Sequence, residues 1–334
     1  MNGHKAEPTT GLIRWGILGC GDVTEVKSGP AFRKIAGSAL MAVMRRDAGK
    51  ARDYAQRHGV PRWYGKAGDL LDDPEIDAVY VASPPSSHFE LGRLVAKAGK
   101  PCYAEKPMGA SSADAQGLID TFARVGLPLL PAFYRRGLPK FRKVRDLLNQ
   151  NAFGMVERVQ YHLASDAHLT CMNWRLDPVI SGGGLFVDLG SHILDLFDFW
   201  FGPLELKSCL AENRSGRGQL ADYVRASLAS QRQSGIEIEF NFAHTGEPRD
   251  WFHIVGEKGS VAFAAFSPDP LQYDFAGVRS LSDENFCTEH VQQNLLENVM
   301  ECLRGRAEPW ATPEAALRTW KLMEGILKNN RAGG

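Results

Sequence analysis

A glycine-containing loop that follows the first β-rich run has the composition of a phosphate-binding turn. The run Ile13–Leu18 (IRWGIL) leads into the residues GCGDVT at 19–24. In such a loop the first glycine permits a tight turn, and the second lets backbone N–H groups approach a pyrophosphate at a helix N-terminus. Because the loop follows the first strand of a βαβ series, we expect a dinucleotide there, with a ligand-free structural turn as the alternative. The residues expected to bind it are Gly19, Gly21, Asp22 and Val23.

The end of the second predicted strand (40–44) indicates which dinucleotide binds. NAD-preferring loops place an acid at this point to bind the ribose hydroxyls, whereas this chain has Arg45 and Arg46. Guanidinium groups pair with a 2′-phosphate, so the sequence favours NADP(H) over NAD(H). Asp47 keeps NAD(H) possible, because a shift of two residues would restore a ribose-binding acid. The alternative for the arginines is an exposed surface pair.

A lysine stands at the end of the short predicted strand 101–104 (PCYA). Glu105-Lys106-Pro107 follows that strand. In a doubly wound sheet, ligands lie beyond the carboxyl ends of the strands, so Lys106 is expected to point toward the cofactor. From there its ammonium group could stabilise a developing alkoxide. Taken alone, Lys-Pro after a strand is more often a solvated turn.

An acid and an imidazole stand four residues apart after a glycine triplet at 182–184. If an amphipathic helix runs from about Gly184 to Trp200, Asp188 and His192 share one face at i,i+4. Such a pair suits proton transfer, with the acid orienting the ring or binding a hydroxyl. The alternative is a hydrogen-bonded structural histidine. No third ligand is placed for a metal, so no metal site is expected.

The order of predicted elements indicates two domains. Strands and helices alternate over 13–132, which calls for a doubly wound parallel sheet with helices on both faces. After about Pro131, consecutive β-rich runs between 206 and 263 indicate an antiparallel or mixed sheet, hence an α+β domain. We therefore expect a dinucleotide-binding domain at 11–131 and a substrate domain at 132–330. The last helix is expected at about 313–330.

Composition excludes several classes of protein. The 334 residues carry 39 Lys+Arg and 39 Asp+Glu, so no basic field for nucleic acid is expected. No uninterrupted apolar run approaches the ~20 residues that span a bilayer. The six cysteines form no CxxC or Cys/His cluster, which favours free thiols in a reducing cytoplasm. The polar N-terminus does not resemble a signal peptide.

Four motifs, in order and spacing, resemble the glucose-fructose oxidoreductase/inositol dehydrogenase (Gfo/Idh/MocA) family. They are Gly19-x-Gly21, the run ASPPSSH at 82–88, Glu105-Lys106-Pro107, and the glycine triplet followed by Asp188 and His192. The resemblance extends from Ile13 to about Asn330. It implies an N-terminal Rossmann domain, a C-terminal domain with a large, open, mostly antiparallel sheet, and a final helix returning toward the first domain. It also implies homodimers or homotetramers formed through that sheet.

The resemblance also implies roles for individual residues. Lys106 matches the catalytic lysine, and Asp188 and His192 match the remaining active-site pair. The loop beside the cofactor corresponds to Ser83, Pro84, Pro85 and His88, with Glu105 at the same strand end as Lys106. Thr24 departs from the Gly or Ala of the fingerprint.

Two further segments are candidates for binding substrate. Tyr134 and Arg136 follow the sixth Rossmann-like strand and could bind hydroxyls or a carboxylate, or instead brace the domain junction. Trp174 could stack on a sugar face beside Arg175, although a buried or interface tryptophan is the commoner case.

These observations predict an NADP(H)-dependent oxidoreductase acting on a sugar, polyol or related hydroxy or carbonyl compound. His192 is the expected proton donor and Lys106 the group that polarises the oxygen, although the two roles could be exchanged. Two other functions remain open: an NAD-dependent glycosidase that oxidises its sugar transiently, and a non-catalytic dinucleotide sensor.

Overall fold

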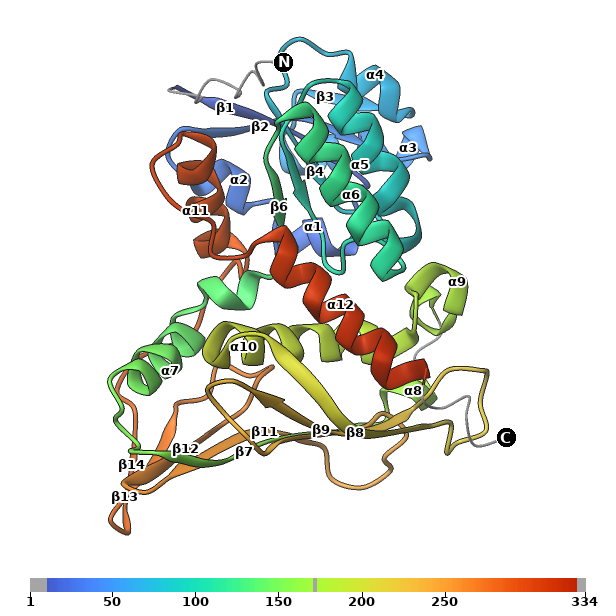
Figure 1. Ribbon diagram of the computed structural model, residues 1–334. Coiled ribbons are helices and arrows are strands. Elements are labelled where there is room, and N and C mark those ends of the chain that lie inside the picture. Colours follow the sequence, from blue (N-terminus) through green and yellow to red (C-terminus); the bar gives the residue numbers. More distant parts are fainter. Residues whose placement is uncertain (1–10, 171–172, 329–334) are drawn as a thin grey trace. The chain divides into compact units, whose positions relative to one another are not determined.

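The computed structural model describes residues 11–170 and 173–328. A six-stranded sheet in the order β3-β2-β1-β4-β5-β6 has every neighbouring pair parallel (Figure 1). Its strands are β1 (Ile13–Leu18), β2 (Ser38–Met44), β3 (Arg62–Tyr64), β4 (Ala78–Val81), β5 (Cys102–Ala104) and β6 (Leu129–Pro131). The strand order reverses at the β1/β4 pair, and the carboxyl ends beside such a reversal are where ligands bind in open α/β sheets. This confirms the doubly wound sheet predicted from the sequence.

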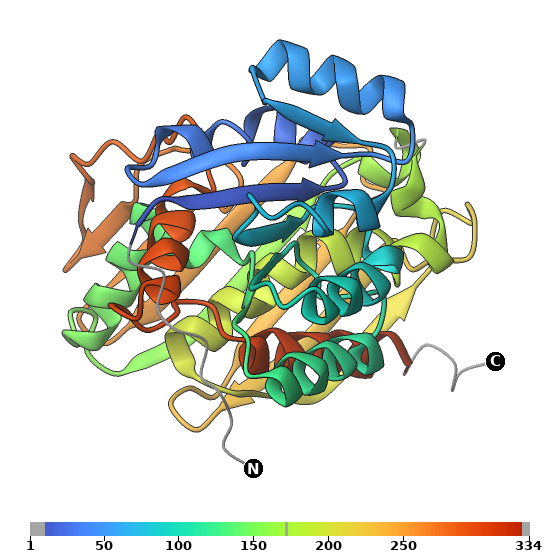
Figure 2. The same cartoon turned by 90° about the horizontal axis from the view of Figure 1, so that it is seen from above.

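The helices that follow these strands begin and end where local chemistry dictates. The Asp47 side chain accepts a hydrogen bond from the Lys50 N–H and caps α3, while Gly59 ends that helix in a left-handed conformation. Helices α5 and α6 lie side by side (Figures 1 and 2). The helical elements of this part are α1 (Asp22–Val26), α2 (Ala31–Lys34), α3 (Ala48–His58), α4 (Ala67–Leu71), η1 (Pro85–Ser87), α5 (His88–Lys97), α6 (Ser112–Val125), η2 (Tyr134–Gly137) and α11 (Gln293–Leu303).

A second, eight-stranded sheet has the order β14-β13-β12-β11-β7-β10-β9-β8, and only its β7–β10 pair is parallel. Along β10 the side chains of Ile236, Ile238 and Phe240 are buried and alternate with half-buried polar ones, as expected for a sheet with one covered face. The strands are β7 (Val156–Ala164), β8 (Leu204–Glu212), β9 (Tyr223–Ser230), β10 (Ile236–Asn241), β11 (Arg249–Gly256), β12 (Gly259–Phe263), β13 (Gln272–Phe275) and β14 (Val278–Leu281). The mostly antiparallel sheet is confirmed.

The helical elements that accompany the second sheet are α7 (Pro139–Asn149), α8 (Ala167–Thr170), η3 (Trp174–Leu176), α9 (Pro178–Ser181), η4 (Phe186–Gly190), α10 (Ser191–Phe201) and α12 (Pro313–Lys328). The sequence analysis missed β3, α4, β13 and β14. Three of these are at most four residues long and α4 has five, too few to establish a periodic pattern. The predicted end of the last helix at Asn330 lies outside the described residues.

The helix predicted from about Gly184 to Trp200 differs from the expectation in two ways. Residues Phe186–Gly190 form a π-helix, and the α-helix α10 begins only at Ser191. In addition, α10 is not amphipathic: all of its residues are buried, and Phe197 and Trp200 pack edge-to-face on Phe252. In the described part of the chain, Pro178–Phe201 is the one stretch long and apolar enough to cross a membrane, but 67% of it is buried inside the protein. That burial is typical of a core helix.

The chain forms two compact units. The first contains the described residues up to Gly137 together with Glu289–Leu317, and the second contains Leu138–Thr288 together with the described residues from Arg318 onward. The first unit extends to Gly137, at the end of η2, whereas the boundary expected from the sequence lies at 131/132. The first unit also contains α11, which contacts η2 and α2.

Candidate active site

Three loops meet where the first unit is expected to hold a dinucleotide. Gly19 has φ +95°, and a Cβ atom there would lie 2.8 Å from the backbone N and Cα of Ser83. The N–H groups of Gly19 and Cys20 donate to the Met44 carbonyl, at 2.9 and 3.2 Å. The loop after β1 therefore contacts the ends of both β2 and β4, and only glycine fits its first position.

Gly21 and Thr24 together shape the start of α1. The Thr24 hydroxyl accepts a hydrogen bond from the Gly21 N–H at 2.9 Å and donates one to the Gly21 carbonyl at 2.8 Å. Thr24 is fully buried, so the departure from the fingerprint is accommodated by a satisfied hydroxyl. A Cβ at Gly21 would meet nothing closer than the Gly19 carbonyl at 4.0 Å. The space beside Gly21 is open, as close approach of a pyrophosphate requires.

Ion pairs connect this loop region to α3. Glu25 of α1 accepts two hydrogen bonds of 2.8 Å from the Arg57 guanidinium and lies 2.7 Å from the His58 Nε2 atom. The Arg57 hydrogen bonds, followed by the contact with His58, lower the pKa of Glu25 to about 2. Tyr54 of α3 also donates to the Thr24 carbonyl at 2.7 Å. These contacts fix α1 relative to α3.

The Glu25 carboxylate should make the stability of the first unit depend on pH. Because its pKa is lowered in the folded state, its contribution is present above the unfolded value of 4.5 and is lost as pH falls toward 2. We expect Glu25→Gln to lower the melting temperature by about 2–4 °C at pH 7. The difference from wild type should shrink between pH 4.5 and 2 in thermal melts. A difference that is constant over that range would contradict the assignment.

The arginines after β2 are placed differently from each other. The Arg45 guanidinium lies 3.4 Å from the Cys20 carbonyl, within the phosphate loop, whereas Arg46 is exposed. Asp47 is occupied as the cap of α3, where it accepts from the Lys50 N–H at 3.1 Å. The structure therefore brings Arg45 to the loop and gives the Asp47 carboxylate a structural partner.

The loop after β4 is held by a buried histidine. His88 is 1% exposed; its Nε2 atom contacts the Ser83 carbonyl and its Nδ1 atom lies 2.8 Å from the Pro107 carbonyl. Burial lowers the pKa of His88. Of the two prolines in this loop, Pro84 is exposed and Pro85 is buried. His88 thus connects the loop after β4 to the loop after β5, and both of its ring nitrogens face protein carbonyl groups.

Lys106 follows a buried carboxylate. Glu105 is 6% exposed and accepts a hydrogen bond of 3.0 Å from the Lys106 backbone N–H, while the Lys106 side chain is partly exposed. The hydroxyl of Tyr80 donates to the same carboxylate. The buried position of Tyr80 and the nearby charge of Glu105 hold the pKa of Tyr80 well above its usual value, so it remains a donor. Lys106 therefore follows β5, which pairs with β4, the neighbour of β1; the direction of its side chain stays a prediction.

The first pair of predicted substrate-binding residues lies in the first unit. Tyr134 and Arg136 belong to η2, and both are buried. Arg136 donates to the carbonyl of Trp310 at 3.2 Å, and the Arg135 guanidinium lies over the Tyr134 ring at 5.4 Å. Both contacts lie within the first unit, and a role in binding substrate or in bracing the domain junction stays a prediction.

Three predicted residues of the second unit form one group. The Arg175 Nε atom donates to the Asp188 carboxylate at 2.7 Å, and its guanidinium lies 4.7 Å from the centre of the Trp174 ring. The side chains of Arg175 and Asp188 are 29% and 19% exposed, so the ion pair is only partly open to water. No sequence spacing indicated this pairing, because η3 and the π-helix are separated by the glycine triplet.

His192 lies at the second position of α10 and is 4% exposed. Its ring meets the Phe266 ring edge-on, with centroids 6.3 Å apart. Asp188 lies in the π-helix and His192 in α10, so the pair does not belong to one continuous α-helix, and a shared face stays a prediction. Single π turns inside helices occur frequently at functional sites. In the described part of the chain, no group of three or more His, Cys, Asp or Glu side chains could hold a metal ion.

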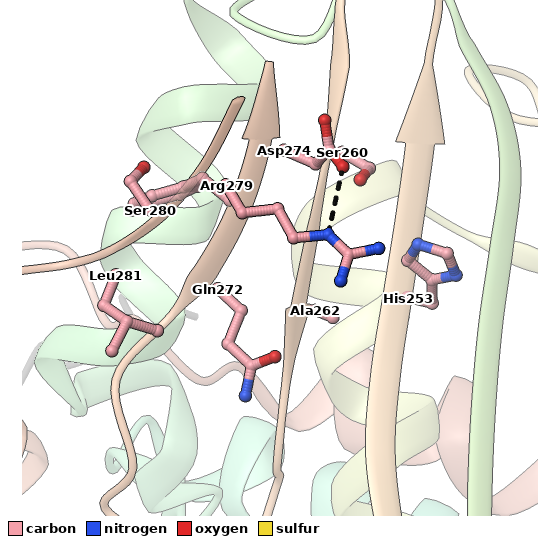
Figure 3. A pocket seen from close by; sticks show the side chains of 9 residues that line it. His253, Ser260, Ala262, Gln272, Asp274, Arg279, Ser280 and Leu281 are labelled. Atoms are coloured by element: carbon pink, nitrogen blue, oxygen red, sulfur yellow. Dashed lines mark ion pairs between the residues drawn. The ribbon is translucent and has the colours of Figure 1, made fainter. Parts of the chain in front are cut away.

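A hollow of about 460 Å³ lies on β11–β14 of the second sheet, well separated in sequence from the predicted site residues. Figure 3 shows the Arg279 side chain extending across it between Asp274 and His253. The Arg279–Asp274 ion pair measures 3.6 Å, and the arginine side chain is 89% exposed. None of the predicted site residues lines this hollow.

Comparison with known proteins places these features in a family. Residues 13–133 match a model described as an oxidoreductase family with an NAD-binding Rossmann fold (GFO_IDH_MocA). Residues 141–262 match the model of a GFO/IDH/MocA C-terminal domain. Oxidoreductase P35 of Formosa agariphila is 37% identical over 317 residues, covering 92% of this chain and 96% of that protein.

Two solved structures show the same fold at lower identity. Aldose-aldose oxidoreductase from Caulobacter crescentus, complexed with glycerol, has a TM-score of 0.85 at 23% identity and covers 97% of this chain and 98% of its own. KijD10, a 3-ketoreductase from Actinomadura kijaniata solved with NADP and TDP-benzene, has a TM-score of 0.83 at 20% identity. That match covers 94% of this chain and 97% of KijD10.

Proposed function

The chain belongs to the Gfo/Idh/MocA family of oxidoreductases, and on that premise we propose that it uses NADP(H) to interconvert a hydroxyl and a carbonyl group of a sugar, polyol or related compound. The observation that carries the proposal is the contact of the loop after β1, at Gly19, with the end of β2 and with Ser83 after β4. Lys106 follows the neighbouring strand β5. The open space at Gly21 fits the approach of a dinucleotide pyrophosphate. When bound, the nicotinamide supplies or accepts the hydride.

The side chains of the chain supply the remaining steps of the proposed reaction. Lys106 donates a hydrogen bond to the reacting oxygen of the substrate and stabilises its negative charge in the reductive direction. His192 gives that oxygen a proton and takes it back in the oxidative direction. Asp188 and its partner Arg175 orient the substrate or the imidazole ring. Burial of His192 keeps bulk water from competing for the proton.

NADP(H) is the proposed cofactor because of the residues that follow β2. Arg45 reaches the phosphate loop, and Asp47 is engaged at the cap of α3 instead of being free to bind a ribose. An arginine at this position pairs with a 2′-phosphate by a charge-assisted hydrogen bond. The relative KijD10, solved with NADP, offers a precedent at the level of the fold alone.

Arg45→Ala should therefore change cofactor preference. We expect kcat/KM for NADPH to fall by about 10–100-fold, because a charge-assisted hydrogen bond is lost, while kcat/KM for NADH changes little. The exposed Arg93 of α5 provides a matched control, and Arg93→Ala should leave both values unchanged. A wild-type enzyme that prefers NADH would contradict the NADP(H) assignment.

The substrate class is tested with a panel of sugars, polyols and dicarbonyls. Each compound is assayed with both cofactors by following the change in absorbance of the reduced nicotinamide. Turnover with a net change in NADPH supports the oxidoreductase. Bond cleavage without such a change would indicate the glycosidase with transient sugar oxidation. Binding of cofactor with no turnover of any compound would indicate a dinucleotide sensor.

We also propose that the protein forms a homodimer or homotetramer through its eight-stranded sheet. The support is the family to which the chain belongs together with the width of that sheet. Sedimentation velocity gives the oligomeric state directly, and a monomer at micromolar concentration would contradict this proposal.

A further inference from the structure

A cluster of buried polar side chains in the first unit lies directly behind Lys106. Its members are Tyr80, which is 0% exposed, Tyr103 and Gln292, which are each 1% exposed, and Glu105, which is 6% exposed. Tyr80 and Tyr103 are register partners on β4 and β5, and their rings stack at 5.0 Å. Gln292 immediately precedes α11 and lies 187 positions after Glu105 in the sequence. The site described above uses Glu105 and Tyr80 from this cluster, and assigns no role to Tyr103 or Gln292.

Hydrogen bonds join the cluster to the main chain of Lys106. The Gln292 side-chain amide donates to the Oε1 atom of Glu105, and its carbonyl oxygen accepts from the Tyr103 hydroxyl at 2.9 Å. The Oε2 atom of Glu105 accepts from the Lys106 backbone N–H at 3.0 Å. One carboxylate therefore connects Gln292 on one side to Lys106 on the other.

The orientation of Glu105 depends on these donors. A carboxylate this deeply buried is tolerated only when N–H and O–H groups satisfy its oxygens. Tyr80 and Gln292 both donate to Oε1, and Gln292 is itself fixed at its other end by Tyr103. The Gln292 backbone N–H also donates to the Lys27 carbonyl at 3.3 Å. Hydrogen bonds therefore hold Gln292 through both its main chain and its side chain.

We propose that Gln292 is a positioning residue for Lys106, acting through the Glu105 carboxylate. Gln292 is 1% exposed, so the role proposed for it is indirect. It fixes the carboxylate whose second oxygen holds the Lys106 amide, and thereby sets the direction in which the lysine side chain leaves the strand end. The consequence for catalysis rests on the proposed function; the hydrogen-bonded connection to the Lys106 amide does not.

The test compares two variants of the purified full-length protein. Gln292→Met removes the amide that contacts Glu105 but keeps the side-chain length, whereas Tyr103→Phe removes the hydroxyl on the far side of Gln292 and leaves the Glu105 contact in place. Amide hydrogen exchange at Lys106, followed by NMR, should be at least about 10-fold faster in Gln292→Met and within about threefold of wild type in Tyr103→Phe. Tyr103→Phe loses one buried hydrogen bond, whereas Gln292→Met loses that bond together with the amide contacts to Glu105 and Tyr80, so the melting temperature should fall further in Gln292→Met.

Steady-state kinetics provides the second measurement. We expect kcat of Gln292→Met to fall about 10-fold with KM for NADPH changed less than about twofold, because a misdirected lysine affects the reacting oxygen and not the cofactor. Tyr103→Phe should keep kcat within about twofold of wild type. An equal loss of kcat in both variants, or a rise in KM alone, would show that the cluster only stabilises the fold and would overturn the proposal.

Failure of the proposed function and failure of the positioning role give different results in these measurements. An inactive wild-type protein would contradict the proposed function, and Lys106 exchange would still decide the role of Gln292. Unchanged exchange in Gln292→Met would overturn the positioning role even in an active enzyme. If Gln292→Met does not fold, Gln292→Asn retains an amide but withdraws it by one methylene from Glu105, and it should speed Lys106 exchange in the same direction.

Discussion

Replacing Lys106 by methionine is expected to lower kcat by about 10²–10³-fold, the loss that follows removal of one donor to a developing oxyanion. The side chain lies at the carboxyl end of β5, where a ligand of a doubly wound sheet binds, and its backbone is fixed by Glu105. Affinity for NADPH, measured by fluorescence titration, should change by less than about twofold, because the interaction is made in the transition state.

Lys97→Met is the matched control for this prediction. Lys97 is an exposed lysine in the last turn of α5, so its replacement removes the same charge without touching the site. Its kcat should remain within about twofold of wild type. A Lys106→Met enzyme that retains more than about a tenth of wild-type kcat would remove Lys106 from the catalytic assignment.

The second large effect is expected at Gly19. Gly19→Ala places a methyl group 2.8 Å from the Ser83 backbone at a residue with φ +95°. We expect the free energy of unfolding to fall by about 2–4 kcal/mol, combining the left-handed backbone penalty with the steric overlap. NADPH binding should be lost as well, because the loops after β1 and β4 must move apart. Urea denaturation and fluorescence titration measure the two effects.

Gly21→Ala separates the structural role of the loop from its role in binding. Gly21 has an extended φ of −166°, and its added Cβ would meet nothing nearer than 4.0 Å. Stability should therefore change by less than about 0.5 kcal/mol. The Kd for NADPH should rise at least about 10-fold, since the methyl group occupies the space a pyrophosphate needs. Normal NADPH affinity in Gly21→Ala would show that the loop does not approach the cofactor as proposed.

Much of the first unit could be read from the sequence because the determining contacts are local. Asp47 and Gly59 define the two ends of α3 through hydrogen bonds and backbone preferences within four residues. Strand β4 is an unbroken apolar run that is followed closely by the breakers Ser83, Pro84 and Pro85. Since each strand end follows its strand directly in sequence, the positions of Gly19, Arg45 and Lys106 at the sheet's carboxyl edge followed without further information.

In the second unit, the sequence predicted the structure less well where the burial of side chains does not follow helical or strand periodicity. The helix from about Gly184 to Trp200 was predicted to be amphipathic, yet even Asp195 and Asp198 of α10 are buried. Arg318 of α12 donates two hydrogen bonds to Asp198, at 2.8 and 2.9 Å, and compensates the buried charge from 120 positions away. No periodicity within the helix reveals a partner at that distance. The same holds for the π-helix that carries Asp188.

The sequence by itself determined the alternation of strands and helices in the first unit, the glycines of the loop after β1 and the types of residue at the strand ends, because these depend on local backbone preferences and on hydrophobic period. Only the tertiary structure decided which side chains support them. Arg175 meets Asp188 across the glycine triplet, His88 joins two loops through their carbonyl groups, and Gln292 reaches Glu105 from a segment near the other end of the chain. Each of these contacts depends on how distant segments fold together, and hydrogen-bonding side chains such as Gln and Arg leave no periodic signal in a single sequence.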